Sequence, residues 1–271
     1  MSEGREKLVP LLRSHAEDDE VTIYVKGFLG RGEKPDHFEA WRDSHRRLTE
    51  SHGWGPRAHG YAWESGRFER LPLPAAAASK LAWDVYARVR RAQRLALWGA
   101  VGVAAAEQVV RIAARLASQY LAASRSARER AEHLAVRLAR LSGRYDRVRV
   151  VAHSLGCVQV IEAAAMLDPW ERPVEIHLCA PACRERDVAD KLDHLGRRRT
   201  WLYHTRSDLV LETAFRLMAR GRALGAVGPR REYPGLHPLE VGEHFGFRVH
   251  GEYKNRLPDF AGGRRRGARA G

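Results

Sequence analysis

The chain is poor in cysteine and has no long hydrophobic run. Its three cysteines among 271 residues are Cys157, Cys179 and Cys183, an odd number that argues against the disulfide framework of a secreted protein. Cys179 and Cys183 lack the second pair that a structural metal site needs, so we interpret all three as small buried apolar residues and expect no metal or other cofactor. The first twenty residues show no apolar segment with a cleavage site, which predicts a cytoplasmic protein.

The most apolar segment, residues 95–110, is 16 residues long between Arg94 and Arg111. A bilayer span needs about 20 residues, so this segment is interpreted as a buried helix or hairpin, with a membrane-dipping helix as the alternative. Acidic residues are outnumbered, 33 against 47 basic ones, for a net charge of +14. The basic residues are spread along the chain without a nucleic-acid-binding motif. We therefore expect no specific nucleic-acid partner, although a basic surface favours peripheral contact with anionic membranes.

Short runs of β-branched residues alternate with longer helical stretches. The pattern predicts an α/β fold, with a mostly parallel central sheet and helices on both faces. Strands are expected at residues 21–25, 57–63, 148–152, 174–178, 201–205 and 239–241, and helices at 36–50, 126–141, 157–167 and 209–220. One domain is predicted over residues 21–260, after an N-terminal segment 1–20. Residues 75–125 are expected to form a helical insertion that acts as a cap or lid, and residues 261–271 a disordered basic tail.

A serine lies where the strand at 148–152 meets the helix that follows, in the pattern Ala152-x-Ser154-x-Gly156. A sharp turn between a strand and a helix requires small residues two positions before and after the serine, because larger side chains would collide with neighbouring backbone. Such a turn exposes the hydroxyl at the carboxyl edge of the sheet, beside the N–H groups that begin the helix. The sequence thus predicts Ser154 as a nucleophile.

A serine hydroxyl needs a base to remove its proton, and in this architecture the order along the chain is serine, acid, histidine. Asp208 follows the strand at 201–205 and is the favoured acid, ahead of Glu212 and Asp187. His250 follows the last expected strand and is the favoured base, with His244 as the alternative.

Attack by the serine creates an oxyanion, which requires preorganised N–H donors. One donor is expected from Leu155, the residue after the nucleophile. The other is expected from the glycine-rich loop after the first strand, where Phe28 is favoured and Leu29 is the alternative.

These segments resemble the α/β-hydrolase superfamily and its lipase-like branch. Within it, the chain is similar to the hydrolase domain of transmembrane-and-coiled-coil proteins, an uncharacterised family. The similarity is carried by the segments YVKGFL at 24–29, VAHSLG at 151–156, HLCAP at 177–181, SDxVL at 207–211 and HxxY at 250–253. Two departures are Lys26, where many lipases have histidine, and Ala152 in place of glycine. The resemblance implies ester hydrolysis without naming a substrate.

Together these features predict a serine hydrolase of carboxylic esters that acts through Ser154, His250 and Asp208 and an acyl-enzyme. A lipid or other acyl ester is the expected substrate class. The alternative is a hydrolase-fold acyltransferase, or a catalytically silent protein that binds membranes or other anionic partners.

Overall fold

The computed structural model describes residues 7–12, 18–28, 35–63, 120–246 and 249–263. The chain divides into two compact units, one made of residues 1–65 and 124–271 and the other of residues 66–123. All elements named below belong to the first unit. The predictions for residues 75–119, for Leu29 and for residues 264–271 lie outside the described residues.

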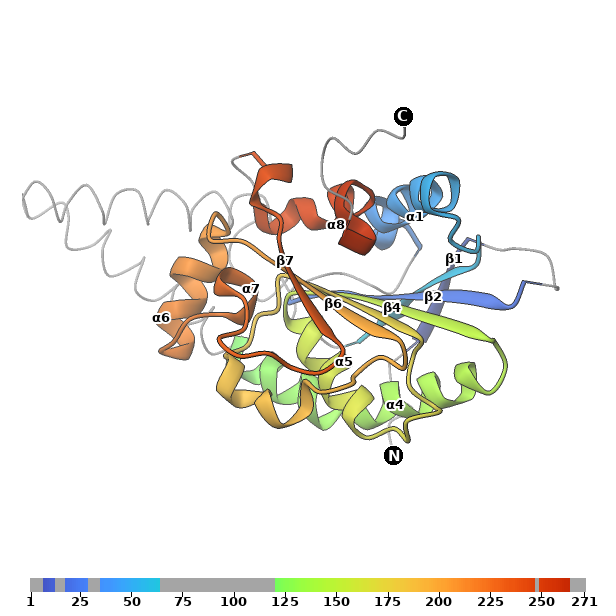
Figure 1. The fold of residues 1–271 in the computed structure, drawn as a ribbon, viewed down its shortest axis with the longest axis horizontal. Coiled ribbons are helices and arrows are strands. Elements are labelled where there is room, and N and C mark those ends of the chain that lie inside the picture. Colours follow the sequence, from blue (N-terminus) through green and yellow to red (C-terminus); the bar gives the residue numbers. More distant parts are fainter. Residues whose placement is uncertain (1–6, 13–17, 29–34, 64–119, 247–248, 264–271) are drawn as a thin grey trace, which may run out of the picture. The chain divides into compact units, whose positions relative to one another are not determined.

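A seven-stranded sheet forms the centre of the first unit (Figure 1). Its order is β1-β3-β2-β4-β5-β6-β7, and only the edge strand β1 runs antiparallel to its neighbour. The strands are β1 Lys7–Leu12, β2 Glu20–Val25, β3 Ala58–Ala62, β4 Arg147–His153, β5 Glu175–Cys179, β6 Arg199–His204 and β7 Leu236–Glu240. The predicted α/β class with a mostly parallel sheet is confirmed.

The central strands are buried because helices cover both faces of the sheet. Val21, Ile23, Val148 and Val150 are fully buried, as expected for strands of a parallel sheet that read as continuous apolar runs. The β-branched side chains of these strands also favour extended backbone. Parallel pairing brings the carboxyl ends of β2, β4, β5 and β6 to one edge of the sheet and their amino ends to the opposite edge.

One face of the sheet carries α1 Glu39–His52 and α8 Val249–Phe260, and the other carries α4 Ala131–Ser142 and α5 Leu155–Ala165 (Figure 1). Helix α1 buries Trp41 and Leu48 at helical spacing, whereas α5 is buried along almost its whole length. Short 3-10 turns cover Pro35–Phe38, Glu185–Asp187, Ala189–Lys191, Gly242–His244 and Ala261–Gly263.

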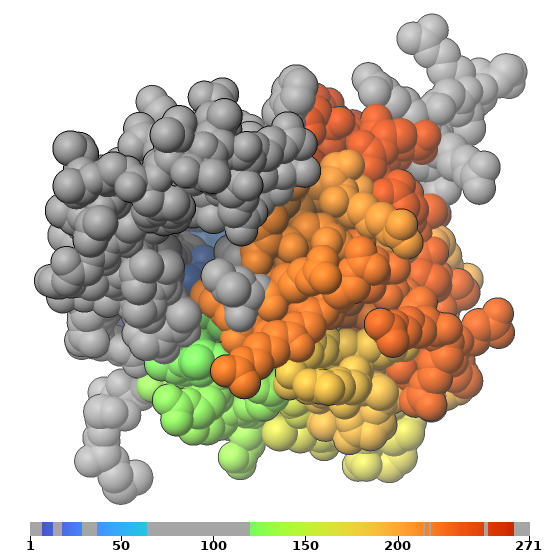
Figure 2. Space-filling view, turned by 90° about the vertical axis from the view of Figure 1, so that its left-hand side faces the viewer, coloured from blue at the N-terminus to red at the C-terminus, as the bar shows by residue number. Residues whose placement is uncertain are grey.

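The chain after β6 was predicted as one helix over residues 209–220. It forms a π-helical stretch, Val210–Phe215, followed by the short helix α6 Arg216–Ala219, and then α7 Leu224–Val227. This segment, orange in Figure 2, lies at the surface on the side of the molecule that is at the left of Figure 1.

Three further elements differ from their predictions. The sequence predicts no strand before residue 20, yet β1 pairs with β3 despite Pro10, which an edge strand tolerates. Strand β7 begins three residues before the expected strand and includes Pro238, again at an edge of the sheet. The helix expected at 126–141 is interrupted by a turn at Arg130, after which α4 begins.

All three cysteines are buried free thiols, which confirms their interpretation as apolar core residues. Burial raises the pKa of the Cys183 thiol to about 12. Within the described ranges, no helix combines the length and the apolar character that crossing a bilayer requires.

Candidate active site

A single turn joins β4 to α5, and Ser154 lies at its centre. Its backbone has φ 55° and ψ −121°, a positive-φ combination that residues with a side chain rarely adopt. The N–H of Ser154 donates to the carbonyl of Cys179 at 2.9 Å, and the carbonyl of Ser154 accepts from the N–H of Ala182 at 3.2 Å. The end of β5 and the residues after it therefore hold the strained serine through two backbone hydrogen bonds.

Small residues are needed around this turn because three backbone segments approach closely. A Cβ at Gly156 would lie 2.4 Å from the carbonyl oxygen of Lys26, and a Cβ at Gly27 would lie 2.8 Å from the Cβ of Ser154. Ala152 is fully buried in the strand before the turn. The loop after β2 therefore passes directly beside the serine, as the oxyanion prediction requires.

Three side chains that are far apart in the sequence form a hydrogen-bonded relay. The Oγ of Ser154 lies 3.1 Å from Nε2 of His250, and Nδ1 of His250 lies 2.7 Å from Oδ2 of Asp208. The carboxylate accepts the proton on Nδ1, which leaves Nε2 as the acceptor for the serine hydroxyl. Ser154 is 5% exposed, so its hydroxyl is less accessible than the motif predicts.

Asp208 is fully buried just beyond the end of β6. Its Oδ1 accepts from the backbone N–H of Leu211 at 3.2 Å, in the first turn of the helical stretch that follows. Its backbone N–H donates to the carbonyl of Thr205 at 3.2 Å. The carboxylate of Asp208 therefore both caps a helical segment and contacts the imidazole of His250.

His250 is the second residue of α8, and the packing of this helix on α1 fixes its position. Arg47 of α1 donates to the carbonyl of Asn255 at 3.0 Å and to the carboxylate of Asp259 at 2.7 Å. Ser44, also on α1, donates to the carbonyl of Lys254. Tyr253 of α8 is fully buried, and its ring centre lies 6.1 Å from that of His153.

His153 is a functional candidate that sequence reasoning did not single out. Its Nε2 donates to the backbone carbonyl of His250 at 2.8 Å, and the two imidazole rings lie 4.7 Å apart. Burial lowers the pKa of His153 well below its usual value, and the nearby His250 and Lys254 lower it further, so the ring stays neutral. Its place inside the motif, directly before the serine, was the available signal.

The two residues expected to supply the oxyanion donors are Leu155 and Phe28. Leu155 is the first residue of α5 and is fully buried. Phe28 is half-buried in the turn after β2, next to Gly27, whose backbone approaches the Cβ of Ser154.

The other acid and base candidates have different partners. His244 is buried beside Phe260, with the two rings 5.5 Å apart, and it is His250 that lies against the serine. Asp187 forms a two-pronged ion pair with Arg184, at 2.7 and 2.8 Å. Glu212 accepts from Arg222 at 3.3 Å.

The serine follows β4 at a strained turn, the acid follows β6, and the histidine follows β7 across a mostly parallel sheet. The chain has the α/β-hydrolase fold. Ser154 lies at the carboxyl edge of the sheet and at the start of α5, which is where this fold presents a reactive group.

Comparisons with known proteins are sparse. No family model matches the chain, and no curated protein matches it. Among solved structures, a thermophilic esterase from the planctomycete Thermogutta terrifontis, with propionate bound, is 12% identical over 94% of this chain and 86% of its own, with a TM-score of 0.36. The Pyrococcus furiosus esterase Pf2001 is 9% identical over 94% of this chain and 91% of its own, with a TM-score of 0.35. The fold assignment therefore rests on the strand order and on the turn at Ser154, and the resemblance to transmembrane-and-coiled-coil proteins stays a prediction.

Proposed function

We propose that the protein is a serine hydrolase that cleaves carboxylic esters. The observation that carries this proposal is the relay of Ser154, His250 and Asp208, with hydrogen bonds of 3.1 and 2.7 Å, centred on a backbone conformation with φ 55°. A strained positive-φ serine costs about 1–3 kcal/mol, which a serine that only capped a helix would not need.

In the proposed reaction, the Oγ of Ser154 attacks the ester carbonyl while Nε2 of His250 takes its proton. Asp208 stabilises the resulting imidazolium and keeps Nδ1 as the donor. The carbon–oxygen bond of the ester then breaks, and the leaving alkoxide takes the proton from His250. Water, deprotonated by the same imidazole, hydrolyses the acyl-enzyme and releases the carboxylic acid and the free serine.

The tetrahedral intermediate carries its negative charge on the former carbonyl oxygen. In this proposal the backbone N–H groups of Phe28 and Leu155 donate to that oxygen, each contributing on the order of 3 kcal/mol in the transition state. The role of His153 is to hold the carbonyl of His250, and with it the imidazole, at the distance that proton transfer requires.

The proposed substrates are acyl esters, including lipids that carry an anionic group. A cavity of about 220 Å³ lies among the segments after β5 and β6, and five arginines line it: Arg184, Arg186, Arg220, Arg222 and Arg230. Ala182, two residues before Arg184, donates its N–H to the carbonyl of Ser154 at 3.2 Å, so a short stretch of backbone connects the cavity lining to the serine. Guanidinium groups favour phosphate and carboxylate groups.

Labelling with a fluorophosphonate probe and hydrolysis of p-nitrophenyl butyrate test the proposal together. The wild type should be labelled and should hydrolyse the ester, whereas Ser154→Ala should lose labelling and at least about 10⁴-fold in kcat. A matched control is Ser51→Ala, since Ser51 is exposed on α1 and its loss should change neither readout. Absence of labelling in the folded wild type would overturn the proposal, and labelling with acyl transfer but no hydrolysis would redirect it to an acyltransferase.

A further inference from the structure

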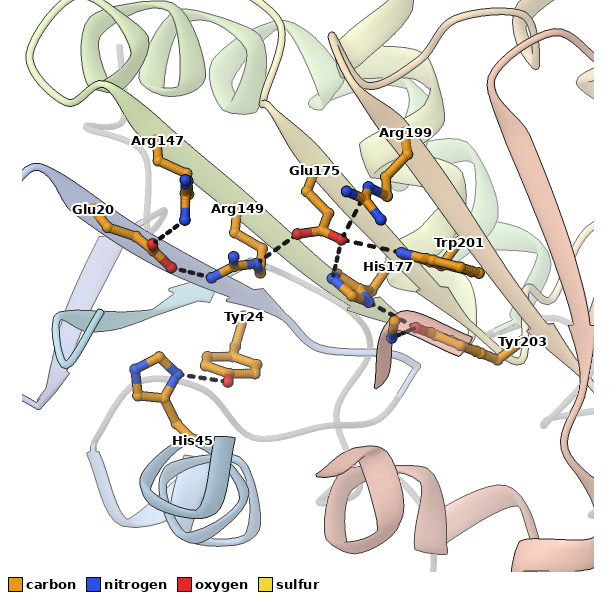
Figure 3. Close-up of polar contacts among 11 residues, drawn as sticks. Glu20, Tyr24, His45, Arg147, Arg149, Glu175, His177, Arg199, Trp201 and Tyr203 are labelled. Carbon is orange, nitrogen blue, oxygen red and sulfur yellow. Dashed lines mark hydrogen bonds and ion pairs between the residues drawn. The ribbon is translucent and has the colours of Figure 1, made fainter. Parts of the chain in front are cut away.

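The amino edge of the sheet carries a charged network that the proposed reaction does not use. Its side chains come from every second residue of neighbouring parallel strands, so all of them lie on the face of the sheet that α1 and α8 cover (Figure 3). They are Glu20 of β2, Arg147 and Arg149 of β4, Glu175 and His177 of β5, and Arg199 and Trp201 of β6.

Arg149 is the fixed centre of this network. It is 4% exposed, its guanidinium lies 3.9 Å from the centre of the Trp54 ring, and its Nε donates to Glu175 at 3.1 Å. Its Nη1 donates to Glu20. The carboxylates therefore engage Nε and Nη1, and the Nη2 group has no protein acceptor among the described residues.

His177 adds a second buried donor. Gly262 donates its N–H to the Tyr203 hydroxyl at 3.3 Å, and that hydroxyl lies 2.8 Å from Nδ1 of His177. We take the hydroxyl as the donor to Nδ1, which places the imidazole proton of a neutral His177 on Nε2. This Nε2–H is buried without a hydrogen-bond acceptor in the described part of the chain, because the nearest oxygen of Glu175 is 3.7 Å away.

Both donors line one cavity of about 240 Å³. Arg149 and His177 are almost fully buried at its floor, whereas the half-exposed Arg147 and Arg199 and the exposed Arg198 lie toward solvent. Four arginines against the carboxylates of Glu20 and Glu175 leave two positive charges in excess when His177 is neutral. An unpartnered N–H donor and this excess charge both call for an anionic acceptor.

We propose that this cavity is a binding site for a phosphate dianion, either inorganic phosphate or the phosphate group of a small monoester. The phosphate oxygens accept from Nη2 of Arg149 and from Nε2 of His177, and the outer arginines neutralise the remaining charge. Arginine suits this role because its planar N–H fork matches phosphate oxygens. The site lies at the opposite edge of the sheet from Ser154 and does not depend on the proposed hydrolase activity.

Isothermal titration calorimetry of the full chain, at constant ionic strength, tests the site with inorganic phosphate, glycerol phosphate and acetate as separate arms. The wild type should bind one phosphate saturably, and Ser154→Ala should bind it equally. Arg198→Gln combined with Arg199→Gln should weaken binding at least tenfold, and these solvent-facing positions can be changed without opening the core. Tighter binding of glycerol phosphate would identify a monoester as the natural form, and tighter binding of inorganic phosphate would identify the free ion.

Two charge-matched controls separate the site from general attraction to a basic protein. Arg137→Gln with Arg140→Gln, on the exposed face of α4, should leave phosphate affinity unchanged. Arg46→Gln with Arg256→Gln, at exposed positions on α1 and α8 outside both basic cavities, should also leave it unchanged. The proposal is overturned if wild-type binding is not saturable, if acetate binds as well as phosphate, or if either control pair weakens binding as much as the Arg198 and Arg199 pair.

Discussion

The two edges of the parallel sheet handle buried charge in opposite ways. At the carboxyl edge, Asp208 is fully buried and is held by the imidazole of His250 and by a backbone N–H. At the amino edge, the carboxylates of Glu20 and Glu175 meet the guanidinium of Arg149 directly. The same strands therefore support a carboxylate held by an imidazole and a backbone N–H at one end, and carboxylates paired with arginine at the other.

This difference separates chemistry from stability. Substituting either partner of a buried ion pair destabilises the fold, because it leaves an uncompensated charge in a poorly hydrated site. A carboxylate that accepts from an imidazole and a backbone N–H keeps its charge available to stabilise an imidazolium that forms next to it. Substitutions at the carboxyl edge should consequently change rates with little loss of stability, and substitutions at the amino edge should do the reverse.

The largest expected effect is that of Asp208→Asn on catalysis. The amide keeps the shape of the carboxylate but lacks its charge, and its NH₂ group can donate to Nδ1 of His250. The imidazole proton would then move to Nε2, which could no longer accept from Ser154. We expect kcat for p-nitrophenyl butyrate to fall by about 10⁴-fold. Asp187→Asn is the matched control, because Asp187 binds Arg184 and should leave kcat within about twofold of the wild type.

Urea unfolding of both Asp208→Asn and the wild type completes that experiment. A loss of kcat of about 10⁴-fold, with the unfolding midpoint of the wild type, supports a role for Asp208 in polarising the imidazole. A variant that keeps wild-type kcat would show that Asp208 is a structural cap only, and would remove the acid from the proposed relay.

Arg149→Leu should have the next largest effect, this time on stability. Glu20 and Glu175 are 13% and 16% exposed and would both lose a buried partner, so the free energy of unfolding should fall by about 3–5 kcal/mol. Arg147→Leu is the control two residues earlier on the same face of β4. That side chain is 50% exposed, so its ion pair with Glu20 should contribute no more than about 1 kcal/mol.

Urea unfolding measures both stabilities, and ester hydrolysis per folded molecule should stay near the wild-type value in each variant. Equal destabilisation by the two substitutions would contradict the distinction between a buried and a half-exposed arginine. A loss of kcat in folded Arg149→Leu would contradict the separation of the two edges.

The carboxyl edge was predictable from the sequence because its signals are local. A β-branched strand, a serine between small residues and the chain order of acid and base led to Ser154, Asp208 and His250, which the structure brings together. Other outcomes needed tertiary information. The contact from His153 to the carbonyl of His250 spans 97 residues, and the position of the His250 ring against the serine depends on how α8 packs against α1.

The charged network at the amino edge was not predicted, because the contacts within it depend on strand register. Arg149 lies opposite Glu175, and Glu175 lies opposite Arg199, only once three strands separated by helices are aligned. The signal was present as charged residues at the starts of otherwise apolar strands, but the even spread of arginine along the chain hid it. Proline hid strand β1 and the first residues of β7 in a similar way, since it usually ends a strand and is tolerated at an edge.

The smallest expected effect concerns pH and tests whether the amino edge keeps a neutral imidazole. Burial lowers the pKa of His177 to about 3, with Arg149 and Arg199 adding to the shift and Glu175 opposing it. The unfolded side chain has a pKa near 6.5, so below that pH the unfolded chain binds a proton that the folded protein does not. The stability that the neutral His177 contributes is complete above pH 6.5 and is lost as the pH falls toward 3.

Between pH 7 and 5.5 this loss amounts to about 1 kcal/mol of the free energy of unfolding. In urea unfolding, the stability of His177→Gln should therefore fall by correspondingly less than that of the wild type over this pH range. His133→Gln, at an exposed position on α4, should keep the wild-type decline, and an unchanged decline in His177→Gln would mean that His177 is already protonated in its place beside Glu175.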